Sequence, residues 1–422
     1  MPVRYHSGVY VLVLACLFAA LSIPIACKAA EWTAEPSATL RHEYNDNIGL
    51  TTQPHNSVNG NVITPRLDLG MHAEAWQITG SAEASRRRYS GESELDRDDN
   101  AFRLSSAYQT ERNTWVLDAT STRDSPLASE QTGSDTGAVQ TLKIREAHGF
   151  SPSWTRMLTE RIKLQLMYQL NDTSYVNGQS VGLYDYRYRT ASTTVSNQLS
   201  EQYQVFVTGG YSSFHTPATG NDSTTRSAQL GITQNFSESM QGTLQAGARR
   251  TETLTQGGHP VYTRFLAIIN GRLTEVLIQT GVTSSARRQE TSSVFSGSLE
   301  KKYELTSINM SFSRALAPSG SGSEVEQDSF DFRLNRIMTP RLNTYINLNS
   351  VIVRDDQGNI SNNNRPYYHA ELGANWAWTQ ELSLNMSYGY SRVKREFEDK
   401  AATANSVYLT LIYRPLKASI SR

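Results

Sequence analysis

Apolar and polar residues alternate along short segments of this 422-residue chain. The clearest example is residues 161–172 (RIKLQLMYQLND), in which lysine and glutamines separate the apolar positions. Those apolar positions are Ile162, Leu164, Leu166, Tyr168 and Leu170. Successive side chains of a strand point to opposite faces, so the pattern predicts a strand with one apolar and one polar face. The same alternation recurs at 203–211, 307–313, 329–335, 382–390 and 407–413.

The segments between these strands are of two kinds. Short ones, most with an acidic residue, lie at 75–77, 110–113, 158–161, 199–202, 236–240, 272–275, 303–306, 339–342 and 379–382. Longer polar ones lie at 91–99, 124–137, 215–222, 254–260, 317–324 and 354–365. Short turns that alternate with long loops are typical of a transmembrane antiparallel up-and-down β-barrel.

The nine short turns also predict the number of strands. They join eighteen strands, and a first strand near 37–48 and a last near 403–414 bring the total to about twenty. We therefore expect an all-β barrel of about 18–20 strands with both chain ends on the periplasmic side. No segment after the first thirty residues sustains the i, i+3, i+4, i+7 apolar spacing of a helix.

A soluble β-helix or a pair of β-sandwiches also shows alternation. Two features favour lipid as the phase that meets the apolar face. Aromatic residues lie near the strand ends, as in an interfacial girdle, at Tyr184, Tyr186, Trp376, Tyr388, Tyr390 and Tyr413. Arginine, aspartate and asparagine occupy the opposite face, which suits a water-filled interior.

Residues 1–30 predict a signal peptide. A basic start precedes an apolar run at 9–23, and small residues follow up to Ala29 and Ala30, where we expect cleavage. A membrane anchor is the alternative, but the run is short and Pro24 interrupts it. Attachment of lipid to Cys27 is another, although Pro24 occupies the position where a leucine-like residue is normal. Residues 31–422 then form a single barrel domain without cysteine, which excludes disulfides and cysteine chemistry.

Charge and motif content exclude several functions. The 40 basic and 40 acidic residues balance, so nothing indicates a nucleic-acid partner. The histidines occur in no recognisable catalytic pattern, so we expect no enzymatic activity. Residues 355–359 (DDQGN) superficially resemble a calcium loop but lack the glutamate that an EF-hand needs at its twelfth position. We therefore expect no metal and no cofactor.

Alternation also assigns charged residues to the interior, where we treat the basic ones as candidate contacts for a polymer. The basic set is Arg66, Arg103, Lys143, Arg145, Lys163, Arg187, Arg189, Arg249 and Arg333, and the acidic set is Asp68, Asp118, Asp331 and Glu371. Arginine binds carboxylates, sulfates and sugar hydroxyls, so a basic ladder suits an anionic or hydroxylated polymer. The alternative is a solvated wall with cross-strand partners. No separate plug domain is visible, although the loop 124–137 has the length to fold inward.

The start and end of the mature chain resemble a known family. The segments LRHEYNDNIGLT (40–51) and VITPRLDLG (62–70) are similar to outer-membrane barrels associated with exopolysaccharide gene clusters and exosortase (PEP-CTERM) systems. The final strand NSVYLTLIYRP (405–415) is also similar to theirs, although the extension after Tyr413 departs from a minimal barrel ending. The resemblance implies polymer export beside a periplasmic polysaccharide-export protein, and it supplies no functional residues.

The leading hypothesis is thus an outer-membrane conduit for an exopolysaccharide in a Gram-negative bacterium. Its expected partners are outer-membrane lipid, the barrel assembly machinery, the polysaccharide and a periplasmic export protein. One alternative is a general or solute-selective porin, which should show a long loop folded into the barrel. The other is a structural barrel for the attachment or assembly of surface proteins, with its lumen blocked.

Overall fold

The computed structural model describes residues 30–125, 143–257, 260–269, 272–282, 285–354, 365–394 and 400–421. The first strands are β1 (Glu31–Asn45), β2 (Val58–His72), β3 (Trp76–Ser90), β4 (Arg97–Gln109), β5 (Asn113–Asp124), β6 (Arg145–Met157) and β7 (Ile162–Tyr175). The next are β8 (Tyr186–Gln198), β9 (Tyr203–Thr216), β10 (Asn221–Ser237), β11 (Met240–Thr255), β12 (Pro260–Ile269), β13 (Arg272–Val282) and β14 (Ala286–Lys302). The last are β15 (Thr306–Pro318), β16 (Glu324–Thr339), β17 (Leu342–Arg354), β18 (Arg365–Ala377), β19 (Leu382–Val393), β20 (Ala402–Tyr413) and β21 (Ala418–Ser421).

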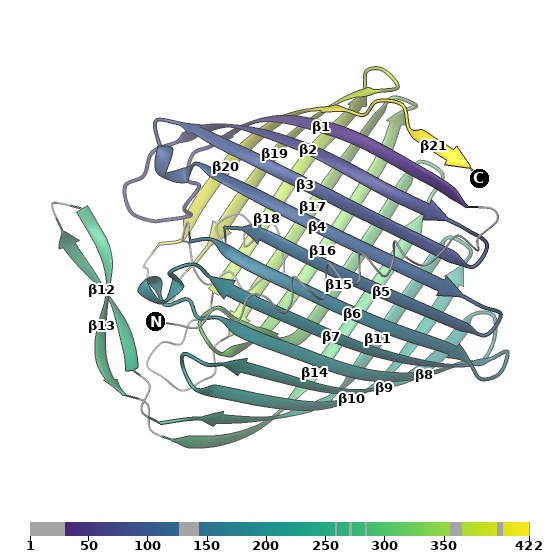
Figure 1. The fold of residues 1–422 in the computed structure, drawn as a ribbon, viewed down its shortest axis with the longest axis horizontal. Coiled ribbons are helices and arrows are strands. Elements are labelled where there is room, and N and C mark those ends of the chain that lie inside the picture. Colours follow the sequence, from purple (N-terminus) through teal and green to yellow (C-terminus); the bar gives the residue numbers. More distant parts are fainter. Residues whose placement is uncertain are drawn as a thin grey trace.

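Eighteen of these strands form a closed antiparallel barrel (Figure 1). Each pairs with the next along the chain, except that β11 pairs directly with β14. The barrel closes where β20 pairs with β1, from Ala38–Tyr413 to Asn45–Ser406, and β21 continues along the first residues of β1. Two short 3₁₀ helices, η1 (Ser93–Leu95) and η2 (Gly178–Val181), lie in the long loops. In the described part of the chain, no helix is long and apolar enough to cross a membrane.

The barrel confirms the predicted fold, and it explains why the count is eighteen rather than twenty. Eight of the nine predicted short turns lie at or within two residues of a turn between barrel strands. The ninth, 272–275, lies within β13, which pairs only with β12 in a separate two-stranded sheet. This β12–β13 hairpin projects from the loop end of the barrel (Figure 1). Its strands alternate like wall strands, so the pattern alone does not separate them.

The outward face of the barrel carries a belt of exposed apolar side chains. Its members include Leu67, Leu69, Phe102, Trp115, Leu166, Val207, Leu230, Leu244, Leu348, Leu372, Met386 and Leu409. Monomeric proteins in water rarely expose large contiguous apolar surfaces, and such surfaces mark contact with membrane or with another protein. Adjacent strands of the closed wall pair in antiparallel ladders, which satisfy backbone groups within the sheet as hydrocarbon requires. The belt therefore faces lipid, and the fold is that of an outer-membrane β-barrel.

The lumen side has small apolar clusters near the loop end. Leu50, from the loop after β1, packs on Val393, Ala402 and Ala404, with Tyr367 beside them. A second cluster joins Val325, Val351 and Val353. Both clusters therefore lie on the lumen side near the external mouth of the barrel.

Residues 46–51 fasten the first strand to the last one at that end. The Asp46 carboxylate accepts hydrogen bonds from the backbone N–H and the side-chain amide of Asn405, both at 2.7 Å. The buried Asn47 side chain donates to the carbonyls of Thr51 and Thr403, both at 2.9 Å, and accepts from the Thr51 N–H. Asp46 and Asn47, which lie in the segment 40–51 that carries the family resemblance, thus form a clasp between β1 and β20 where the barrel closes.

Replacing Asn47 with alanine should weaken this clasp. The change removes three hydrogen bonds and leaves the Thr51 and Thr403 backbone groups without them, so we expect a loss of about 2–4 kcal/mol. The measurement is the urea concentration at which the heat-modifiable gel band is lost. Asn56→Ala is the matched control, since Asn56 is exposed and donates one hydrogen bond, to Glu92. Equal midpoints for the two variants would contradict the clasp.

Candidate functional site: a lateral seam and an inward hairpin

The wall of the barrel is incomplete between β14 and β15. β14 pairs with β11 continuously from Ala286 to Lys301. Its pairing with β15 begins only at Phe295, opposite Arg314. Residues 286–294 of β14 therefore have no partner strand on the β15 side within the described chain. We call the gap between residues 286–294 of β14 and residues 315–318 of β15 the seam.

Aromatic and cationic groups form the lower border of the seam. The rings of Phe295 and Phe312 lie 6.1 Å apart between centroids. The Arg314 guanidinium lies over the Phe295 ring, 5.1 Å from its centroid, and also binds Asp328 through two hydrogen bonds of 2.6 and 2.8 Å. These contacts fix the level at which the two strands separate.

On the external side of Phe295 and Arg314, the end of β15 bends away from the wall and into the lumen. We call residues 315–327 the inward hairpin: the end of β15, the turn 319–323 and the start of β16. Its turn contacts loops on the opposite side of the seam from β15. The Tyr184 N–H donates to the Gly320 carbonyl at 2.8 Å, and the Asn221 amide donates to the Gly322 carbonyl at 2.9 Å. Gly322 has φ +86°, a conformation that disfavours a side chain.

An ion pair shows on which side of the wall the inward hairpin lies. Arg249 of β11 faces the lumen, because Leu244, an odd number of residues away, faces outward. Glu326 shares the face of β16 that carries Phe330, which is outward and exposed. Even so, Arg249 Nη2 and Glu326 Oε2 lie 2.6 Å apart. This face of the hairpin thus packs against the inner face of β11, on the β14 side of the seam.

This packing buries polar groups. Ser319, Glu324 and Gln327 of the hairpin are buried, as are Ser223 and Arg249 of the wall. Among the described residues, both carboxylate oxygens of Glu324, the Ser223 hydroxyl and Arg249 Nη1 have no hydrogen bond of good geometry. The docked hairpin is therefore held by a few strong polar contacts, chiefly the ion pair between Arg249 and Glu326.

The network around Glu326 supplies most of the holding contacts. Besides Arg249, Glu326 faces Arg354 at 3.4 Å and Arg314 at 3.6 Å. Asp328 completes it, 2.7 Å from Arg354. Three arginines thus share two carboxylates at the base of the hairpin.

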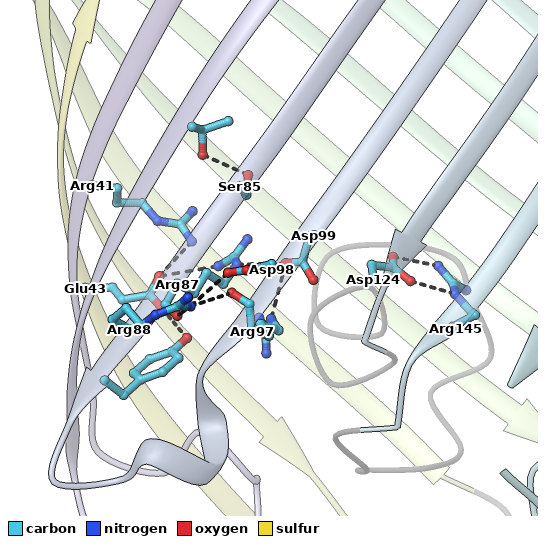
Figure 2. Close-up of polar contacts among 12 residues, drawn as sticks. Arg41, Glu43, Ser85, Arg87, Arg88, Arg97, Asp98, Asp99, Asp124 and Arg145 are labelled. Atoms are coloured by element: carbon cyan, nitrogen blue, oxygen red, sulfur yellow. Dashed lines mark hydrogen bonds and ion pairs between the residues drawn. The ribbon is translucent and has the colours of Figure 1, made fainter. Parts of the chain in front are cut away.

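A second polar cluster lines the inner wall near the loop ends of β1 to β4. Figure 2 shows it around Glu43, whose side chain is only 7% exposed. Glu43 binds Arg41 at 2.6 Å, lies 3.7 Å from Arg87 and accepts a hydrogen bond from the Tyr89 hydroxyl. Asp99 lies 3.1 Å from Arg87 and 3.3 Å from Arg97. The cluster joins three strands, β1, β3 and β4, from inside the lumen.

Replacing Glu43 with alanine should therefore destabilise the barrel. The change leaves Arg41 and Arg87 near the lumen wall without this carboxylate, a loss that costs roughly 3–5 kcal/mol when an ion pair is buried. The urea midpoint of the heat-modifiable band measures it. Asp98→Ala is the control, because Asp98 lies on the outward face and binds the exposed Arg88. A Glu43→Ala midpoint within error of the control would show that the cluster adds nothing.

The structure places the predicted lumen residues in different environments. Arg66 faces the lumen and binds Asp68 at 2.6 Å, Arg145 binds Asp124 at 3.0 Å (Figure 2), and Arg333 donates to Asn347 at 3.0 Å. Arg249 holds the inward hairpin, as described above. Arg103 faces the lumen, opposite Ser81 and Thr120. Lys143 precedes β6 and belongs to no strand, so alternation does not assign it a face.

Two predicted positions are on the other face. Arg187 and Arg189 point outward, because they alternate in phase with the outward Val195. Arg187 binds Asp172 there at 2.6 Å. Tyr186, which its residue type and its place at a strand end predict to be outward, is instead buried inside against Phe214 with ring centroids 5.6 Å apart. A tyrosine that faces the lumen at the mouth of a wide barrel has the same place in the sequence as a tyrosine of the outer girdle, so the sequence does not distinguish the two.

The expected basic ladder is also largely neutralised. Arg66, Arg145 and Arg249 each have a carboxylate partner on the inner wall or the hairpin. The loop 124–137, proposed to fold inward, and the calcium-like segment 355–359 lie almost wholly or wholly outside the described residues. Within the described ranges, no group of three or more His, Cys, Asp or Glu side chains is arranged to hold a metal ion.

Comparison with known proteins adds one family. The model of the SlipAM family, described as surface lipoprotein assembly modifier, matches residues 125–254. That segment spans β6 to β11, the part of the wall that carries Tyr184, Asn221 and Arg249. No curated protein matches the chain.

Solved outer-membrane proteins are also similar. OpdK of Pseudomonas aeruginosa is 11% identical, with 91% of this chain and 99% of that chain covered and a TM-score of 0.43. OccK5 (OpdH) of the same organism is 8% identical, with 91% and 98% covered and a TM-score of 0.44. OccAB3 of Acinetobacter baumannii is 10% identical, with 91% and 99% covered and a TM-score of 0.42. Identities and TM-scores of this size give no information on function.

Proposed function

We propose that this outer-membrane barrel assists the assembly of lipoproteins on the bacterial surface. One observation carries the proposal: the segment that matches the surface lipoprotein assembly family is the wall that receives the inward hairpin. The same hairpin, by leaving the sheet, opens the seam. The family match and the docked hairpin thus involve the same strands of the wall, between β6 and β11.

The physical demands of a lipoprotein support this reading. Its acyl chains must stay in lipid while its polypeptide reaches the external surface. A complete barrel wall separates lumen from lipid with a continuous hydrogen-bonded sheet. A wall whose pairing stops in its external half, as here above Phe295, gives a polypeptide a lateral route beside the lipid.

A deletion strain tests the proposal. Surface lipoproteins, labelled by a membrane-impermeant reagent and digested by protease on intact cells, should lose surface exposure when the gene is removed and regain it on complementation. Total lipoprotein in the cell should stay the same. Unchanged surface labelling in the deletion strain would contradict the proposal.

A solute-selective channel is the second candidate, and the inward hairpin favours it. Porins narrow the lumen with a segment folded into the barrel, and residues 315–327 occupy such a position. Purified protein in planar bilayers should then conduct small ions, and the deletion strain should take up a small solute more slowly while its surface lipoproteins stay exposed.

Export of an exopolysaccharide, with a periplasmic export protein as partner, is a third proposal that rests on the sequence resemblance. The ion-paired lumen arginines supply less free basic surface than that mechanism expects. Secreted polysaccharide measured in the same deletion strain tests it, since export predicts its loss with normal lipoprotein display and normal solute uptake.

A further inference from the structure

We infer that the outward face of β8, β10 and β11 carries a binding site for the phosphate groups of a phosphorylated glycolipid in the outer leaflet. Three exposed arginines form the site, and we call them the arginine patch: Arg189 of β8, Arg226 of β10 and Arg250 of β11. They alternate in phase with exposed apolar residues of the same strands, which are Val195, Leu230 and Leu244. The patch therefore lies on the lipid side of the wall, so the inference does not depend on the function proposed above.

Two members of the arginine patch stand directly opposite each other. Arg226 and Arg250 form a cross-strand pair of β10 and β11. Like charges in such a pair repel and destabilise the sheet. Arg250 donates to the Gln289 side chain at 2.6 Å, whereas neither Arg226 nor Arg189 has a hydrogen-bond or ion-pair partner among the described residues. An anion bound beside these guanidinium groups would offset the repulsion.

The carboxylates that border the arginine patch are engaged with other basic side chains. These outward pairs are Asp172–Arg187, Asp222–His215 and Glu252–Arg287. None of these three carboxylates contacts a member of the patch. The patch therefore keeps its positive charge, and its anionic partner has to come from outside the chain.

The height of the arginine patch on the wall matches the level at which acyl chains end. Phe236 is exposed near the periplasmic end of β10, and Arg226 lies ten residues closer to the loop end. On a strand tilted by about 40°, ten residues of about 3.4 Å each climb about 26 Å, which is close to the height of the apolar band of an outer-membrane barrel. Leu230, between them, is 65% exposed. Arg226 thus lies at the border between acyl chains and headgroups.

Hydroxyl groups lie between the arginines on the same face. Tyr211 is opposite Arg226, and Ser213 is opposite both Arg189 and Thr224 on its two neighbouring strands. Guanidinium groups bind phosphate oxygens through paired hydrogen bonds, and hydroxyls both donate to and accept from sugars and phosphates. Cations, hydroxyls and an apolar surface beneath them fit a lipid that combines phosphate, sugar and acyl chains. A zwitterionic phospholipid fits less well, because its own ammonium group neutralises its phosphate.

Titration of the purified full-length barrel in detergent with purified lipopolysaccharide, the probe for such a glycolipid, tests the site. The measured quantity is the apparent Kd from the mobility shift of the folded band on non-denaturing gels. The test variant combines Arg226→Gln and Arg250→Gln. The matched control combines Arg88→Gln and Arg187→Gln, because these two arginines are also outward and exposed but each is paired with an aspartate.

We expect the test variant to bind lipopolysaccharide at least about tenfold more weakly than the unmodified protein, and the control to bind within about twofold of it, because charge-assisted bonds to phosphate are strong. Dephosphorylated lipopolysaccharide should bind all three proteins equally weakly. Equal Kd values for the test variant and the control, or values that dephosphorylation leaves unchanged, would overturn the inference. Complete competition by inorganic phosphate alone would also overturn it, since a soluble anion would then suffice.

A stability measurement separates loss of the site from loss of the fold. Without lipid, the test variant should need at least as much urea as the unmodified protein to lose its heat-modifiable band, because the Arg226–Arg250 repulsion is removed. A lower midpoint would show that the two arginines stabilise the wall and would contradict the inference. Arg189→Gln, with the same expected loss of affinity, serves if the double variant gives no heat-modifiable band.

Discussion

Replacing Glu326 with alanine should release the inward hairpin from the wall. The change deprives the buried Arg249 of its partner and removes contacts to Arg354 and Arg314. Breaking a buried pair costs roughly 3 kcal/mol or more, which is on the order of a hundredfold in the ratio of docked to released hairpin. We expect faster protease cleavage in the turn 319–323 on intact cells and a larger single-channel conductance in planar bilayers.

The control for this experiment lies on the same strand. Asp331 faces the lumen on β16 but binds only the Asn349 amide among the described residues, at 2.7 Å. Asp331→Ala should therefore leave cleavage and conductance as in the unmodified protein. Identical behaviour of the Glu326 and Asp331 variants would mean that the ion pair does not hold the hairpin.

Fixing the hairpin inside the barrel should abolish lipoprotein display. Glu324 and Ser223 lie beside each other across the interface, so Ser223→Cys with Glu324→Cys places two thiols within reach of a short bifunctional reagent. A cell treated with a reducible cross-linker should lose nearly all newly exposed lipoprotein and recover it after reduction. The physical reason is that a fixed hairpin cannot widen the seam.

The single-cysteine variants are the controls, because each carries a thiol but cannot be bridged. Both should display lipoproteins normally in the presence of the reagent. Normal display in the bridged double variant would show that the hairpin does not need to move, and the function would then have to proceed with the lumen narrowed.

Much of the fold follows from the sequence because a lipid-facing strand has few options. Every wall strand must place apolar residues on alternate positions and must end in a polar turn, so the strands and eight of the nine short turns could be predicted. The β12–β13 hairpin is the exception among the predicted strands. Its residues alternate like those of the wall, and only long-range pairing, with β11 against β14, excludes it from the barrel.

The candidate site was harder to predict, although one signal was present. Glu324, Glu326 and Asp328 occupy the same face of β16 as Phe330 and therefore the face that meets lipid in a regular wall strand. Three carboxylates on that face are incompatible with burial in hydrocarbon, so they indicate only that this end of the strand lies outside the lipid layer, as do Asp98 and Asp172 on strands that stay in the wall. Where it lies depends on Arg249 and Asn221, far away in the sequence.

For a related reason, the predicted face was wrong for some single residues of the wall. Tyr186 is buried inside the mouth against Phe214, whereas its residue type and its place at a strand end predicted the outer girdle. Assigning it outward reversed the phase of β8 and placed Arg187 and Arg189 inside. A strand with few large apolar residues offers no second marker to correct such an error.

The inward hairpin is the central feature of the proposed function, and a distance measurement in native outer membranes tests its position directly. Spin labels at Ser321→Cys, in the hairpin turn, and Thr219→Cys, in the loop that the turn contacts, report the separation. In a continuous wall, four strand spacings would separate β9 from β15, or about 19 Å along the sheet. We expect one dominant distance well below that value, because the Thr219 hydroxyl lies 3.4 Å from the Gly322 carbonyl. A dominant distance at or above the continuous-wall value would place the hairpin in the sheet, close the seam and contradict the account.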